Sequence, residues 1–100
     1  MERYEKAPAR LELGRIVISD VASAALEASK VEGVLLLARH LNGDWGDLPA
    51  ADTLQNELAL LLGGRVFSRY ALPDGSEIWI VTEGDRSMTR ILLVESELGR

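Results

Sequence analysis

Any histidine-based acid–base chemistry in this chain would depend on His40, the only histidine among its 100 residues. Imidazole is the side chain that exchanges a proton most readily near neutral pH. The carboxylates nearest in sequence, Asp44 and Asp47, follow the predicted helix that carries His40 and would be able to orient its ring. A structural interpretation competes with this one, because the helix dipole stabilises a histidine near a helix C-terminus. We favour the structural interpretation.

A polar turn within residues 78–94 is the second place where chemistry could reside. The segment is predicted to form two strands, and the turn between them contains Glu83, Asp85, Arg86 and Ser87. These side chains could bind a metal ion, an anion or a protein partner, although acidic turn residues usually shape the turn by bonding neighbouring amides. No set of Asp, Glu and His residues has a recognised metal-ligand spacing, so the sequence predicts neither a metal site nor a cofactor.

The loop at residues 43–47 carries Trp45, one of only two tryptophans. Tryptophan is enriched among the residues that dominate binding energy, so Trp45 could anchor a partner. The competing interpretation is that Trp45 covers the edge of the core while Asp47 caps the next helix. If this loop and the polar turn lie at one end of the sheet, the predicted partner-binding residues are Asp44, Trp45, Asp47, Glu83, Asp85 and Arg86.

Motifs for covalent catalysis are missing from the sequence. The chain has no cysteine, which removes disulfides, thiolate nucleophiles and cysteine metal sites together. Ser68 has no histidine near it in sequence, and no nucleophile elbow, P-loop or dinucleotide fingerprint occurs. Nothing points to a pair of glycosidase carboxylates either. From motifs alone we therefore predict no catalytic residue.

Hydrophobic periodicity predicts the elements that would position these residues. A short strand at 14–19 precedes helices at 20–28, at 34–41 and from Pro49 to 62, and three strands follow at 65–72, 77–83 and 87–94. The turn at residues 72–76 (LPDGS) is a strong hairpin signal. This order predicts an α+β fold with a short N-terminal strand, two to three helices and a three-stranded antiparallel meander with the helices on one sheet face. We expect a single domain at 11–96, with tails at 1–10 and 97–100.

Alternation along the strands predicts which residues share a face. The helix-covered face is expected to contain Phe67, Ala71, Trp79, Val81, Ile91 and Leu93, packed under helices that carry Leu37, Leu41, Leu58 and Leu62. The open face is expected to contain Ser68, Tyr70, Ile80, Thr82, Arg90 and Leu92. Among these, Ser68, Tyr70, Thr82 and Arg90 would form the polar part of the open face.

Charge and length limit the partners. The net charge is −5 and the isoelectric point is about 4.8, whereas proteins that bind nucleic acid through its phosphates are usually basic. Direct nucleic-acid binding is therefore disfavoured. No leader sequence and no membrane-spanning apolar run is present, so we expect a cytoplasmic protein. The sequence does not define the oligomeric state.

Several motifs resemble a family of small proteins from bacterial plasmids, phages and chromosomes, whose members are labelled plasmid-related proteins or assigned to type I restriction systems. The matching segments are LGRIV (13–17), ARH (38–40), GDWGDL (43–48), WIVTE (79–83), DRS (85–87) and ILL (91–93), with Asn56, Gly64, Arg65, Ser68, Tyr70, Leu72, Gly75 and Thr89 between or beside them. The resemblance spans residues 11–94 and implies a mobile-element setting without an established activity. Family members end in Pro–Glu–Tyr after the last strand, which this chain lacks, so no role of that tyrosine is carried over.

The order of elements also resembles that of RelE-type toxins, which are small ribonucleases that cut RNA with basic and aromatic groups on the open sheet face. That resemblance would give catalytic parts to His40, Arg65, Tyr70 and Arg90, with Arg69 nearby. Three hypotheses result. The first is a non-enzymatic mobile-element accessory protein that inhibits a restriction or CRISPR complex by binding its basic nucleic-acid surface. The second is a RelE-like ribonuclease or an inactive relative, and the third is a structural or regulatory interaction module.

Overall fold

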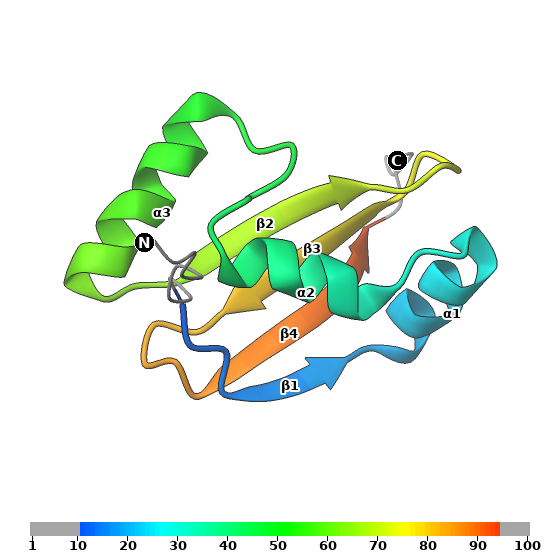
Figure 1. Cartoon of the computed structure of the whole chain (residues 1–100), viewed down its shortest axis with the longest axis horizontal. Helices are drawn as coiled ribbons and strands as arrows, with labels where there is room; N and C mark the ends of the chain where they lie inside the picture. The colour runs from blue at the N-terminus through cyan, green and yellow to red at the C-terminus, as the bar shows by residue number, and fades with distance from the viewer. Residues whose placement is uncertain (1–10, 95–100) are drawn as a thin grey trace, which may run out of the picture.

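Seven elements follow one another along residues 11–94, which are the residues described in this computed structural model (Figure 1). They are β1 (Arg15–Ile18), α1 (Asp20–Ser29), α2 (Gly33–Leu41), α3 (Ala50–Leu62), β2 (Val66–Ala71), β3 (Glu77–Thr82) and β4 (Met88–Val94). The predicted α+β class is confirmed. The predicted tails lie outside the described residues, as do positions 95 and 96 of the predicted domain. No helix within 11–94 is long and apolar enough to cross a membrane.

The four strands form one sheet in the order β1-β4-β3-β2. The β2–β3–β4 part is the antiparallel meander that the turn signals predict. In the first turn, the carboxylate of Asp74 accepts hydrogen bonds from the amide and hydroxyl of Ser76. Strand β1 is added at the far edge, where it runs parallel to β4 with Ile16 opposite Thr89. This parallel pairing between distant segments was not part of the prediction.

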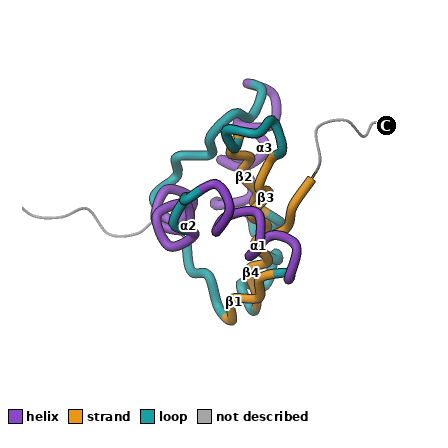
Figure 2. The backbone as a smooth tube through the Cα atoms, turned by 90° about the vertical axis from the view of Figure 1, so that its right-hand side faces the viewer, coloured by secondary structure: helices purple, strands orange, loops and turns teal. Residues whose placement is uncertain are grey.

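Helices α1 and α2 lie on one side of the sheet, and no helix of the described residues covers the other side (Figure 2). Helix α1 begins after Ser19, whose side-chain oxygen accepts a hydrogen bond from the amide of Ala22 and so caps the helix. The main core combines Leu26 of α1, Leu36 of α2, and Ile78 and Ile80 of β3. A second cluster, which includes Trp45, forms against the inner side of α3.

The predicted assignment of sheet faces is wrong for β2 and β3. Ser68, Tyr70, Ile80 and Thr82 are buried on the helix-covered face, although the alternation pattern placed them on the open face. Phe67, Ala71, Trp79 and Val81, expected under the helices, belong to the open face. Strand β4 was assigned correctly: Ile91 and Leu93 pack into the core, and Arg90 and Leu92 lie on the open face.

The predicted inner faces of the helices need a similar correction. Helix α2 buries Leu36 and His40, while Val34 is exposed and Leu37 and Leu41 are half-buried. Helix α3 buries Asn56 and Ala59, so the predicted core leucines Leu58 and Leu62 point to solvent. The cause is a pair of hydrogen bonds between the Asn56 side-chain amide and both backbone groups of Phe67, at 2.7 and 3.1 Å. Asn56 thereby takes the place of a neighbouring strand at the edge of β2.

Candidate functional site

His40 lies at the centre of a buried chain of polar side chains. Its Nδ1 is 2.6 Å from the hydroxyl of Ser68, and its Nε2 is 2.9 Å from the hydroxyl of Thr82. The Thr82 hydroxyl is 2.7 Å from that of Thr89, which donates a hydrogen bond to the carbonyl oxygen of Leu13. All four polar side chains of this network are fully buried; they are those of His40, Ser68, Thr82 and Thr89. Ser68 and Thr82, which were predicted for the open face, therefore belong to a satisfied network inside the core, whereas Arg90 does lie on the open face.

Burial determines the protonation state of this network. It lowers the pKa of His40 to about 4, so the imidazole is neutral near pH 7. Burial likewise raises the pKa of Tyr70 to about 12, and the phenol donates a hydrogen bond to the carbonyl oxygen of Asp44. Neither group faces solvent, where a substrate would have to bind. His40 has a structural place between helix and sheet, but the predicted reason, a favourable interaction with the helix dipole, does not account for a ring that burial keeps neutral.

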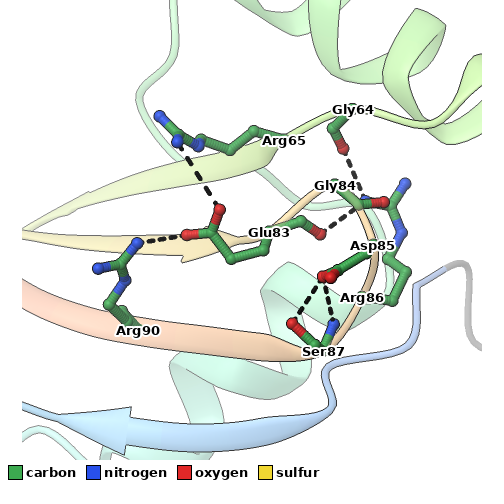
Figure 3. A network of polar contacts seen from close by, with 8 residues as sticks. All are labelled: Gly64, Arg65, Glu83, Gly84, Asp85, Arg86, Ser87 and Arg90. Carbon is green, nitrogen blue, oxygen red and sulfur yellow. Dashed lines mark hydrogen bonds and ion pairs between the residues drawn. The ribbon is translucent and has the colours of Figure 1, made fainter.

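The four residues suggested by the RelE resemblance do not converge. His40 and Tyr70 are on the helix-covered face of the sheet, whereas Arg65 and Arg90 are on the opposite side. Both arginines form ion pairs with Glu83, and the Arg65 contact measures 3.7 Å (Figure 3). Because the sheet separates the two pairs, they cannot act on the same substrate atom.

The loop at 43–47 has a structural role. Trp45 is buried and packs edge-on against His40, with 5.7 Å between ring centroids, so the interpretation as a cover over the core is confirmed. Asp44 forms a 2.7 Å ion pair with Arg39, and this hydrogen bond lowers the pKa of the carboxyl. The loop pairs with the edge of β2 through backbone hydrogen bonds at Arg69. The Arg69 amide donates to the carbonyl oxygen of Trp45, and the Arg69 carbonyl oxygen accepts from the amide of Asp47. The predicted capping by Asp47 is wrong, because α3 begins after Pro49 without a side-chain cap.

The polar turn between β3 and β4 is also held by its own contacts (Figure 3). Asp85 accepts hydrogen bonds from the amide and hydroxyl of Ser87 at 3.0 and 2.6 Å. The guanidinium of Arg86 donates to the carbonyl oxygens of Gly64, Ala59 and Glu83, which fastens the turn to the C-terminal end of α3. Three of the predicted partner-binding residues, Glu83, Asp85 and Arg86, thus have partners inside the molecule.

The predicted binding surface is not assembled as expected. The loop meets β2 at Arg69 and Tyr70, whereas the turn follows Thr82, which pairs with Val66 at the other end of β2. Four residues of strand separate Tyr70 from Val66, a distance of roughly 13 Å. Trp45 is buried, so it cannot anchor a partner inside an acidic rim.

A different surface is present on the open side of the sheet. An apolar group on this side, which we call the sheet-face patch, consists of Phe67, Trp79, Val81 and Leu92. The rings of Phe67 and Trp79 lie 5.4 Å apart in a tilted arrangement. A cavity with a volume of about 280 Å³ is lined by these four residues together with Arg65 and Arg90.

Paired charges frame the sheet-face patch. On one side Glu83 lies between Arg65 and Arg90. On the other side, the guanidinium of Arg69 is 3.0 Å from the carboxylate of Glu77 and 5.8 Å from the ring centre of Trp79. The Trp79 indole donates a hydrogen bond to the same glutamate. The hydrogen bond from Arg69 lowers the pKa of Glu77. The patch therefore combines aromatic surface with charges that are already largely neutralised.

A signal for this face was present in the sequence. Arg69, Glu77 and Arg90 alternate in step with Phe67 and Trp79, whereas the buried positions of β2 and β3 carry no charged residue. Charged residues are almost never buried without a partner, so they identify the solvent face more reliably than aromatic residues identify the core.

Within residues 11–94, no group of three or more His, Asp and Glu residues is arranged to hold a metal ion. The chain matches no family model. No curated protein and no solved structure is significantly similar to it.

Proposed function

We propose that this protein acts by binding another protein, without catalysis, and that the sheet-face patch is the centre of the contact. The observation that carries this proposal is the apolar group of half-buried Phe67 and Trp79 and exposed Leu92 on a sheet face that no helix of residues 11–94 covers. Aromatic residues flanked by arginine are the composition of binding hot spots. The face is built on paired strands, and preorganised surfaces lose less entropy on binding.

The charges around the patch favour a protein over a nucleic acid as the partner. Each of Arg65, Arg69 and Arg90 is paired with a glutamate, so a phosphate group approaching them would also meet Glu77 or Glu83. The net charge of −5 adds a general repulsion. A protein surface that carries charges of both signs can instead form new ion pairs with these arginines and glutamates.

We further propose that the partner is a restriction or CRISPR complex of the host, and that the protein blocks its basic nucleic-acid-binding surface. The acidity of the chain supports this proposal because it would accelerate association with a basic surface. The resemblance to plasmid and phage proteins supplies the biological setting. A RelE-like ribonuclease is disfavoured, since its four candidate residues lie on opposite sides of the sheet.

A restriction assay in cells tests this function. Expression of the protein in a strain with an active type I restriction or CRISPR system is expected to raise the plating efficiency of a targeted phage. Leu92→Glu, which places a charge in the patch, should abolish the protection. Leu35→Glu is the matched control, because Leu35 is exposed on α2 far from the patch. Growth arrest in a strain without any defence system would contradict the proposal, and would instead indicate a toxin.

A further inference from the structure

Helix α3 exposes an apolar face on the side turned away from the sheet. The exposed fractions are 59% for Leu54, 41% for Leu58, 79% for Leu61 and 78% for Leu62. At about 100° per residue these leucines share one side of the helix with Ala50 and Ala51. We call these six residues the leucine face. Gln55 borders the leucine face on one side and Glu57 borders it on the other, while Asp52 lies farther round the helix.

This arrangement is unusual for a helix at the surface. The inner side of α3 is already packed on β2 through Asn56 and Ala59, so the leucine face is not needed for the core of the chain. The helix stands at the outer edge of the molecule beside β2 (Figure 1). An amphipathic helix normally turns its polar side to water, and an apolar stripe of this size on the outside marks a protein-interaction surface.

The leucine face complements itself in an antiparallel arrangement. Small residues, Ala50 and Ala51, are at its N-terminal end, and the bulky pair Leu61 and Leu62 is at its C-terminal end. When two such helices pack antiparallel, each leucine pair lies over the alanine pair of the other copy. Leu54 then meets the second copy's Leu58. Opposed helix dipoles also favour this orientation.

A hollow at the end of the helix fits the same arrangement. A cavity of about 320 Å³ is lined by Gln55, Leu58, Ala59 and Leu62 on the helix and by Gly63, Gly64 and Arg65 after it. In the antiparallel pair, the second copy's Leu54 reaches this hollow.

We infer that the protein forms a two-fold symmetric homodimer through the leucine faces of two α3 helices. A second copy is the occupant because the small and large ends of the face match only when the same face is reversed, as a two-fold axis requires. This inference goes beyond the proposed function, since the leucine face shares no residue with the sheet-face patch, although Arg65 lines a cavity beside each of them.

A charge-swap experiment tests the dimer. Sedimentation or light scattering of the wild-type protein should give twice the monomer mass of 10.9 kDa. The variants Leu54→Glu/Leu58→Glu and Leu54→Lys/Leu58→Lys should each dissociate at least about 100-fold more readily, because like charges would meet at the axis. An equimolar mixture of the two variants should form a dimer with one copy of each.

Leu35→Glu serves as the control, because Leu35 is 62% exposed on α2 and should leave the dimer intact. Circular dichroism of each variant checks that the fold is kept. The inference is wrong if the wild-type protein has the monomer mass at every concentration, if the doubly acidic variant dimerises as tightly as the wild type, or if the mixture stays monomeric. A monomer whose α3 variants lose the anti-restriction activity would assign this face to the foreign partner instead.

Discussion

His40 illustrates at the residue scale how a polar side chain is accommodated in this core. Both ring nitrogens have hydroxyl partners, Ser68 on β2 and Thr82 on β3, so the imidazole ties a helix to two strands. A buried group of this kind is costly only when a partner is missing. The neutral ring can donate one hydrogen bond and accept the other, whereas the protonated ring can only donate.

This arrangement predicts a loss of stability on mild acidification. The pKa of His40 is about 4 in the folded protein and about 6.5 in the unfolded chain, so in between only the unfolded chain binds the proton. The free energy of unfolding should fall by about 2 kcal/mol between pH 7 and pH 5. Urea unfolding at the two pH values measures it. His40→Gln should be less stable at pH 7 but lack this drop, and an equal drop in the variant would show that another group is responsible.

Arg86 is expected to matter for stability more than any other arginine near the turn. Its guanidinium bonds to carbonyl oxygens of Gly64 and Ala59 that would otherwise lack these donors. Arg86→Ala should therefore lower the free energy of unfolding by about 2–4 kcal/mol. Arg90→Ala, which removes an exposed ion pair with Glu83, should change it by less than about 1 kcal/mol. Thermal denaturation of both variants provides the comparison, and similar losses would contradict this role of Arg86.

At the scale of elements, the two edges of the sheet are treated differently. The edge of β2 is covered by Asn56 and by the loop at 43–47, whereas β1 forms the other edge of the sheet. Covering a strand edge prevents unwanted pairing with other chains. The covering loop depends on Gly46, which has a φ of +75° and lies against the backbone of Arg69.

Gly46→Ala should displace this loop. A Cβ atom at Gly46 would lie 2.0 Å from the carbonyl oxygen of Arg69, which cannot move without breaking the β2 edge. Gly63→Ala is the matched control, since Gly63 also has a positive φ but has open space where a Cβ would be. Gly46→Ala should cost at least about 2 kcal/mol more than Gly63→Ala and should speed hydrogen exchange at the Arg69 amide. Equal costs would mean that only backbone strain matters.

The sequence predicted the elements well and the packing of β2 and β3 poorly. Turn signals such as Pro73-Asp74-Gly75 and the glycines around the helices are local, so the boundaries agree with the structure within one or two residues. The side of the sheet on which a strand residue lies depends on contacts with residues far away in sequence. Ser68 and Thr82 looked suited to solvent because their partner, His40, belongs to a distant helix, and Trp79 looked suited to the core because its cover of arginine side chains was not visible.

The assignment of Ile80 to the helix-covered side and Trp79 to the open side of the sheet leads to a direct prediction about the core. Ile80 is fully buried among helix residues, so Ile80→Ala should cost about 2–5 kcal/mol. Trp79 is half-buried on the open face, so Trp79→Ala should cost less than Ile80→Ala despite removing a larger side chain. Denaturant unfolding of both variants decides between the two faces, and a larger loss for Trp79→Ala would restore the original assignment.

At the scale of the whole molecule, two of the apolar surfaces of the described residues are assigned to contacts. The sheet-face patch centres on Trp79, and the leucine face lies on α3. The first is the proposed contact with a foreign protein and the second is the inferred contact with another copy. The polar residues that suggested catalysis serve the fold, since His40 and Tyr70 are buried and Arg86 bonds to backbone carbonyls.

An inhibition titration tests the central claim, that the protein binds a defence complex without catalysis, most directly. Increasing amounts of purified protein would be added to a fixed amount of purified type I restriction or CRISPR complex before DNA cleavage is measured. We expect cleavage to stop near one equivalent of binding sites, with no dependence on preincubation beyond the time of binding. Leu92→Glu should require a much larger excess, and Leu35→Glu should match the wild type. Inactivation by far less than one equivalent that increases with time, degradation of RNA in the complex, or no inhibition of any such complex would contradict the claim.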